Sequence, residues 1–202
     1  MRYSSAVLFA ALMVCGSVSP VFACRGENNA TMVKLTDLAD GIVRAGDDQY
    51  NFKLAPDSNH SFRLTTAPSH DVGFCVDVSI LDSSDIQNTV TGVLFWGGVN
   101  DQNEYYCLFI RNDQYTIIHY LFGKPYELVP WTTDASIKKG LRQKNEVDLR
   151  LTATGADLQI NGAQLTNIVA RPSADAQKYG VVFVSPKTGP GLFQVGLPRI
   201  VK

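Results

Sequence analysis

The stretch Thr91–Tyr120, TGVLFWGGVNDQNEYYCLFIRNDQYTIIHY, decides the fold. Apolar and aromatic residues dominate three segments of it, and two short polar stretches separate these segments. Side chains of a β-strand point alternately to the two faces of a sheet, and bulky apolar residues favour that conformation. The stretch therefore predicts three consecutive antiparallel strands.

Asn112-Asp113 separates the last two segments and is typical of a two-residue hairpin turn. The turn sets the register of the two strands, in which four cross-strand pairs share one face: Arg111–Gln114, Phe109–Thr116, Cys107–Ile118 and Tyr105–Tyr120. The other face carries the more apolar pairs Ile110–Tyr115, Leu108–Ile117 and Tyr106–His119, and we expect it to pack on the core. The first face is then expected to point outward, and a slip of one residue would exchange the two faces.

The rest of the chain from Gly41 onward has the same character. Short alternating segments recur, with turn-forming residues between them every eight to twelve residues, and no segment has a convincing helical period. Asn161-Gly162 is a strong signal for a hairpin, and Pro130 places its segment at a sheet edge or exit. We expect an all-β, two-sheet antiparallel sandwich over residues 41–202, forming one domain.

Three segments carry a family resemblance: GVLFWGGVNDQNEYYCLFIRNDQYTIIHY (92–120), NEVDLRLTATGADLQINGAQL (145–165) and YGVVFVS (179–185). Together they resemble the concanavalin A-like, laminin G-like jelly roll of exported bacterial-type proteins. The resemblance covers about residues 41–202. It implies a jelly-roll fold, and its members include lectins, glucanases, sugar-binding modules and adhesion domains. A fold with so many uses assigns no single function.

The N-terminus predicts an exported chain. Arg2 supplies a positive start, Ala6–Val18 is an apolar run too short to span a bilayer comfortably, and Val21 and Ala23 fit a cleavage site. We expect a signal peptide over residues 1–23 and a polar lead-in over residues 24–40. No later run predicts a transmembrane segment. The expected location is periplasmic or secreted, and a lipid anchor on Cys24 is the alternative.

Composition excludes one class of partner. The chain has 18 Lys and Arg against 19 Asp and Glu, for a formal net charge of −1, and the basic residues are scattered along the sequence. Binding to a phosphate backbone requires a basic face. We therefore expect no nucleic-acid partner.

Three cysteines remain in the expected mature chain: Cys24, Cys75 and Cys107. An oxidising compartment favours one disulfide and one leftover cysteine. Cys75 and Cys107 both lie on the less apolar faces of their strands, and Cys75–Cys107 is the preferred pair if these strands are neighbours. A bond from Cys24 to either one is the alternative. The spacing predicts no metal site, because no CxxC or suitably placed His is present.

The outward face of the hairpin suggests a ligand site. Tyr105 and Tyr120 lie close to the polar loop 97–104, in which Asp101 and Asn103 can hydrogen-bond hydroxyl groups. Aromatic faces with nearby polar side chains are typical of sugar recognition. We predict carbohydrate-binding residues Trp96, Asp101, Asn103, Tyr105 and Tyr120, with ordinary cross-strand packing as the alternative. Trp131 is expected either at the rim or capping the core.

No catalytic residues are predicted. Glycoside hydrolysis needs two carboxyl groups across the scissile bond, and Glu146 and Asp148 on one strand read as an exposed charged face. Asp82 and Asp85 fall short of a calcium site, and no motif implies a cofactor. The expected function is a non-catalytic module that binds a glycan or a cell-surface polymer. The alternatives are a glycoside hydrolase or lyase with an unrecognised site, and an adhesion module that binds protein.

Overall fold

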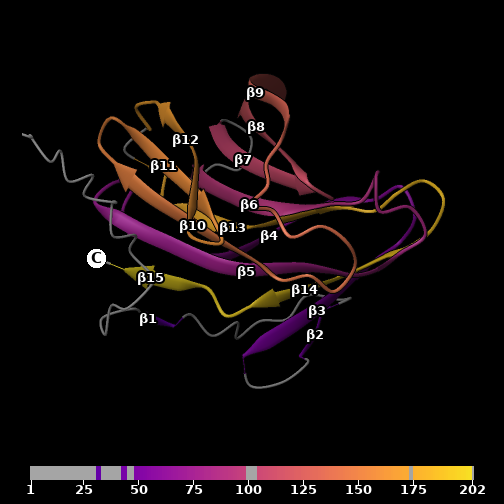
Figure 1. Ribbon diagram of the computed structural model, residues 1–202. Coiled ribbons are helices and arrows are strands. Elements are labelled where there is room, and N and C mark those ends of the chain that lie inside the picture. The colour runs from indigo at the N-terminus through magenta and orange to yellow at the C-terminus, as the bar shows by residue number, and fades with distance from the viewer. Residues whose placement is uncertain (1–30, 33–41, 45–47, 99–103, 173–174, 202) are drawn as a thin grey trace, which may run out of the picture.

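The structure is a computed structural model, and it describes residues 31–32, 42–44, 48–98, 104–172 and 175–201. The predicted signal peptide lies outside the described residues, as does most of the predicted lead-in. The described part of the chain consists of strands and connecting turns and contains no helix. It forms the expected two antiparallel sheets (Figure 1).

Sheet A has the order β12-β11-β10-β5-β14-β3-β2, and β15 joins it by pairing with both β5 and β1. Its strands have these bounds: β1 Thr31–Met32, β2 Ile42–Arg44, β3 Gln49–Leu54, β5 Val72–Ser83, β10 Asn145–Thr152, β11 Gly155–Ile160, β12 Ala163–Val169, β14 Gly191–Gly196 and β15 Arg199–Val201. The two-residue strand β1 falls within the stretch that was expected to be a lead-in.

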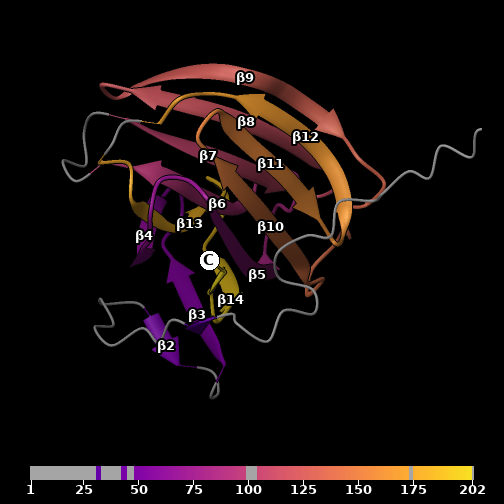
Figure 2. The ribbon, with the colours of Figure 1, turned by 90° about the vertical axis from the view of Figure 1, so that its left-hand side faces the viewer.

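Sheet B has the order β4-β13-β6-β7-β8-β9. Its strands are β4 Asn59–Thr66, β6 Val90–Gly97, β7 Glu104–Arg111, β8 Gln114–Leu121, β9 Lys124–Thr133 and β13 Lys178–Val184. In Figure 2, strands β10, β11 and β12 of sheet A lie over strands β6, β7 and β8 of sheet B. Strand β9, which contains Pro130, is the edge strand that the sequence predicted.

The core lies between the sheets and is built by alternation. Phe74, Val76 and Val78 of β5 face Val93, Phe95 and other apolar side chains of sheet B, and all are fully buried in one cluster. Phe52 and Phe183 pack across the sheets with ring centroids 5.0 Å apart. Burial of such side chains is the main stabilising term in a domain of this size.

The predicted hairpin register is confirmed. Arg111 pairs with Gln114, Tyr105 pairs with Tyr120, and every pair between them is the expected one. Tyr106, Leu108, Ile110, Tyr115 and Ile117 lie in the core cluster. The less apolar face therefore does point outward. The Asn161-Gly162 hairpin is also confirmed, because both residues have positive φ angles, 53° and 83°.

Two predictions about individual side chains are wrong. Asp148 was expected in water, but its exposed fraction is 1%. Cys107 is a free, buried cysteine, so it does not pair with Cys75. The reason is geometric: Cys75 lies on the outer face of sheet A and Cys107 lies on the outer face of sheet B, so the two side chains point in opposite directions away from the core. Cys75 is disulfide-bonded.

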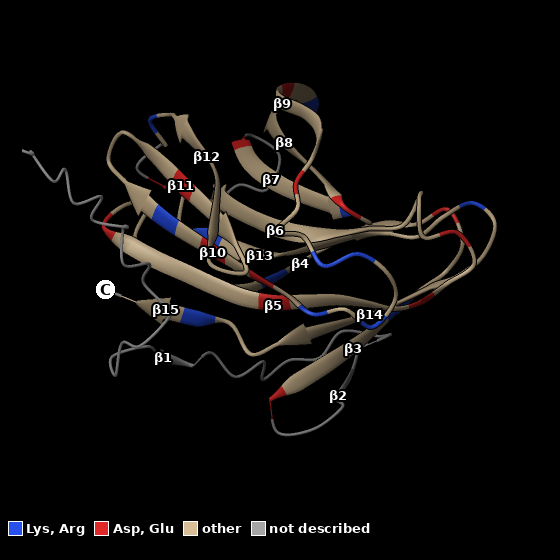
Figure 3. Cartoon of the chain, viewed as in Figure 1, with Lys and Arg blue, Asp and Glu red and all other residues tan. Residues whose placement is uncertain are grey.

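The remaining surface features agree with the composition. Acidic and basic residues are interspersed over the strands and loops in the view of Figure 3, and no basic face is seen there. Within the described residues no helix is long and apolar enough to cross a membrane.

Candidate functional site

The outer face of sheet B carries the candidate site. Tyr105 of β7 and Tyr120 of β8 are directly opposite each other. Their rings are stacked, with centroids 4.7 Å apart and an interplanar angle of 13°. Both side chains are half-buried. A stacked pair held by two strands is a rigid platform, because each ring restricts the χ1 and χ2 rotation of the other.

A second aromatic platform lies on the same face. The guanidinium carbon of Arg111 lies 4.0 Å from the centroid of the Trp131 ring. Arg111 Nε also donates a hydrogen bond of 3.2 Å to Gln114 Oε1. The cation–π contact and the hydrogen bond together fix the guanidinium, whose remaining N–H groups are suitable donors to ligand hydroxyl or carboxylate oxygens.

A small hollow of about 80 Å³ adjoins Tyr105. It is lined by Ser61, Arg63, Leu94, Gly97, Gly98, Glu104 and Tyr105. Arg63 comes from β4 and Tyr105 from β7, with β13 and β6 between them. Gly180, which pairs with both Arg63 and Leu94, keeps the intervening surface low because it has no side chain. The hollow therefore places a cation and a hydroxyl group beside the aromatic ring.

Apolar side chains make up the centre of this face. Val90, Leu94, Cys107, Phe109 and Val182 form a second buried cluster, which we call the outer-face cluster. Tyr105, Tyr120 and Trp131 pack against it. The sequence pattern predicts a more polar surface here. An apolar centre bordered by Tyr, Trp and Arg is the composition of a binding face rather than of a plain solvated sheet.

Burial sets the protonation of the tyrosines. It raises the pKa of Tyr120 to about 12, with smaller contributions from Cys107 and Tyr105. It also raises the pKa of Tyr105, again with a contribution from Cys107. Both phenols are therefore neutral at physiological pH, where each can donate one hydrogen bond and accept another.

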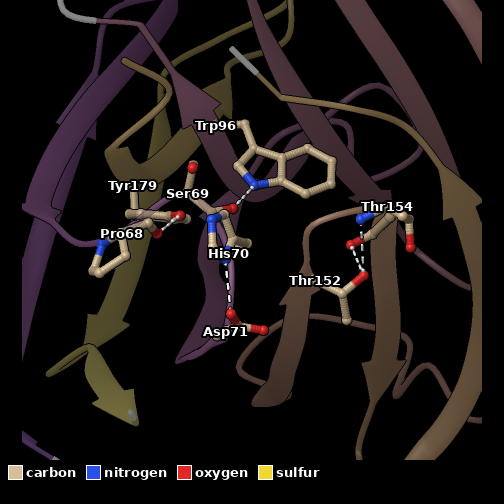
Figure 4. Close-up of polar contacts among 9 residues, drawn as sticks. Pro68, Ser69, His70, Asp71, Trp96, Thr152, Thr154 and Tyr179 are labelled. Atoms are coloured by element: carbon tan, nitrogen blue, oxygen red, sulfur yellow. Dashed lines mark hydrogen bonds and ion pairs between the residues drawn. The ribbon is translucent and has the colours of Figure 1, made fainter. Parts of the chain in front are cut away.

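Trp96 does not belong to this face, contrary to the prediction. Its side chain is fully buried, and its Nε1–H donates a 2.5 Å hydrogen bond to the Ser69 carbonyl (Figure 4). The cause is a β-bulge: Phe95 and Trp96 stand opposite the single residue Tyr179, and Trp96 has a positive φ of 53°. A bulge breaks the alternation of faces, so both rings enter the core, where Trp96 packs against Tyr106.

The structure brings together only part of the predicted site. It confirms that Tyr105 and Tyr120 are neighbours, whereas Asp101 and Asn103 lie outside the described residues. Sequence reasoning missed Arg63, because its strand joins the sheet through β13 from a distant part of the chain. The sequence allows Trp131 either at the rim or capping the core, and the structure places it on the outer face.

Comparisons with known proteins support the fold. No family model and no curated protein matches the sequence. One similar solved structure comes from work on endo-acting O-glycanases of the human gut microbiota. It has a TM-score of 0.60 at 8% identity, and the match covers 90% of this chain and 95% of that chain. Alginate lyase A1-II', of polysaccharide lyase family 7, has a TM-score of 0.57 at 12% identity, covering 81% and 84%.

A carbohydrate-binding module, CBM66 from Bacillus subtilis, has a TM-score of 0.50 at 11% identity and covers 84% of this chain and 94% of that chain. The structural similarity shows a shared jelly-roll fold, and the sequence identities are too low to show more. They do not assign the function of the neighbours to this chain.

Proposed function

We propose that this protein binds a glycan or a similar cell-surface polymer through the outer face of sheet B. The single observation that carries the proposal is the stacked, half-buried pair Tyr105–Tyr120 on that face. Tyr105 borders the hollow that Arg63 and Ser61 also line. Trp131 with Arg111 provides a second aromatic contact on the same surface.

The arrangement suits a chain of sugar residues. The C–H faces of a pyranose pack on aromatic rings, and its hydroxyl groups need donors and acceptors around those rings. Arg111, Gln114 and Ser61 supply such groups at different points of the face. The fold supports the proposal further, since the neighbours of this chain include a carbohydrate-binding module and glycan-acting enzymes.

We propose a binding role rather than hydrolysis. Hydrolysis of a glycosidic bond uses two carboxyl groups about 5–10 Å apart. Among the described residues, Glu104 borders the hollow but is hydrogen-bonded to His119 at 2.9 Å. Glu127 of β9 lies opposite Ile118 of β8. Ile118 in turn lies opposite Cys107 of β7, and Glu104 is three residues from Cys107 on that strand. The two carboxyl groups are thus separated by two strand positions and three residues, which supports a face that holds a ligand without cleaving it.

The proposal is tested by screening the purified protein on a glycan array and then titrating the best glycan by calorimetry. Tyr105→Ala is expected to weaken binding by about 5- to 30-fold, because a central aromatic contact contributes about 1–2 kcal/mol. Tyr105→Phe keeps the ring and is expected to lose about 3-fold or less, the low end of the cost of one hydrogen bond, because the phenol is only half-buried. Equal affinities for wild type and Tyr105→Ala would show that the ligand binds elsewhere.

Export is the second part of the proposal. The apolar run Ala6–Val18 and the site after Ala23 support secretion or periplasmic location, with lipidation of Cys24 as the alternative. N-terminal mass determination of the protein from its native host distinguishes these cases. A mature chain that begins at an unmodified Cys24 is expected. A mass increase of acyl chains on Cys24 indicates the anchor, and an intact Met1 contradicts export.

A further inference from the structure

A second hollow lies on the outer face of sheet A, on the opposite side of the sandwich from Tyr105 and Tyr120. Its volume is about 290 Å³, and its lining consists of Asp48, Gln49, Asp77, Ser79, Lys144, Gln194, Gly196, Leu197 and Arg199. Small-molecule sites begin at roughly this size. The hollow therefore suits one compact ligand rather than a segment of polymer.

The floor of the hollow is set by strand register. Ser79 of β5 pairs with Gln194 of β14, which in turn pairs with Asn51 of β3. The next outward position of β14 is Gly196, opposite Gln49. A Cβ atom at Gly196 would lie 3.0 Å from the Cβ of Asp77. Glycine thus keeps the floor open at the point where a side chain would fill it.

Two ion pairs lie at the hollow. Lys144 Nζ lies 3.0 Å from Asp77 Oδ2, and Arg199 lies 3.0 Å from Glu146 Oε1. The lining itself holds two carboxylates and two cations, Asp48 and Asp77 against Lys144 and Arg199. A site for an ionised ligand presents an excess of the opposite charge. This balance favours a neutral ligand.

One polar side chain lies at the floor of the hollow. Ser79 lines the hollow, and its exposed fraction is 5%. Strand alternation turns this side chain away from the core and toward the hollow, together with Asp77. Its hydroxyl group can donate one hydrogen bond and accept others. Gln194 donates its amide to Asn51 Oδ1 at 3.1 Å, which leaves its Oε1 able to accept a further bond.

From these observations we propose that this hollow is a separate binding site for a neutral, hydroxyl-rich ligand of the size of one monosaccharide. The hydroxyl of Ser79 and the amides of Gln49 and Gln194 match ligand hydroxyl groups, which both donate and accept. Leu197 and the bare backbone at Gly196 offer a small apolar surface to the C–H groups of such a ligand. The site is independent of the glycan-binding face proposed above.

The test is a titration monitored by ¹⁵N amide shifts, with D-glucose, D-galactose, D-mannose and N-acetyl-D-glucosamine as neutral probes and D-glucuronate as the charged probe. At least one neutral sugar is expected to give saturable shifts at Ser79, Gln194 and Gly196. D-glucuronate is expected to bind more weakly. Because shifts are assigned to residues, binding on the two faces of the sandwich is read separately.

Two variants sharpen this test. Ser79→Ala is expected to weaken the saturating sugar by about 3- to 10-fold, the effect of one hydrogen bond, and Gly196→Ala is expected to abolish its shifts by filling the floor. Lys53→Ala, on the same face of β3 but outside the hollow, is the control and should bind as wild type. The proposal is overturned if no neutral sugar saturates, if D-glucuronate binds as tightly, or if both pocket variants retain wild-type affinity.

Discussion

Cys107 is enclosed by the outer-face cluster, with an exposed fraction of 2%. Burial raises the pKa of its thiol far above the ordinary value, and the thiolate is the reactive form. In the native protein at pH 8, a thiol reagent such as DTNB is therefore expected to leave Cys107 unmodified, and one thiol per chain should react after denaturation. Rapid labelling of the folded protein would contradict the burial of this face.

Cys75 is expected to be bonded to Cys24. The chain has four cysteines, Cys15 lies in the predicted signal peptide, and Cys107 is free. Removal of a native disulfide typically lowers the free energy of unfolding by about 2–5 kcal/mol, so Cys75→Ser is expected to fall in this range in urea denaturation. Non-reducing peptide mapping should recover the linked peptides of Cys24 and Cys75. Recovery of Cys75 as a free thiol would refute the pairing.

Tyr120 is expected to make the free energy of unfolding depend on pH in the alkaline range. Its pKa in the folded protein is raised to about 12, above the ordinary value of about 10 that applies to the unfolded chain. The contribution of Tyr120 to the free energy of unfolding is fully present below pH 10 and is lost as the pH rises from there toward 12. The reason is that the phenol loses its proton at a lower pH in the unfolded chain than in the folded one. Urea denaturation at pH 9 to 12 should show a smaller fall for Tyr120→Phe than for wild type. Parallel pH curves would contradict the shift.

At the scale of elements, the β11–β12 hairpin is tied to sheet A by its turn. Asn161 Nδ2 donates to the Ser136 carbonyl at 2.7 Å and to Asn145 Oδ1 at 2.8 Å, and Asn161 Oδ1 accepts from the Glu146 amide at 3.1 Å. Asn161→Gly keeps the positive φ and removes only these bonds. It is expected to lower the free energy of unfolding by about 1–3 kcal/mol.

Asn112→Gly is the matched control for that change. Asn112 also has a positive φ, 46°, but its side chain makes only a 3.5 Å contact with Asp113. Its loss is expected to be within about 0.5 kcal/mol. Thermal or urea unfolding of both variants provides the comparison. Similar losses at the two turns would mean that the side-chain bonds of Asn161 do not stabilise the hairpin.

Local pattern predicted the elements well and their partners poorly. The turn Asn112-Asp113 determined which faces of β7 and β8 point inward, because a two-residue loop leaves one register. Alternation failed at Trp96, where a bulge turns an expected surface ring into the core. The predicted Cys75–Cys107 disulfide was also wrong. Alternation shows which face of its strand each cysteine occupies, but it does not show to which of the two sheets the strand belongs. Arg63 and Tyr105 border the same hollow only because of the non-local strand order β4-β13-β6-β7.

At the scale of the whole molecule, the sandwich separates two candidate surfaces. The outer face of sheet B presents aromatic rings, Arg63 and Arg111 over an apolar cluster. The outer face of sheet A presents a compact polar hollow. The core between them isolates the two surfaces, so a substitution on one face is expected to leave binding on the other unchanged.

The central claim, that the stacked tyrosines hold a glycan, is tested most directly by calorimetry of the double variant Tyr105→Ala/Tyr120→Ala with the tightest glycan from the array. Tyr126→Ala is the matched control, because Tyr126 is exposed and lies on the edge strand on the same side as His119, away from the outer face. We predict that the double variant loses about 30-fold or more in affinity and that the control binds as wild type. Wild-type affinity in the double variant, or an equal loss in Tyr126→Ala, would contradict the claim.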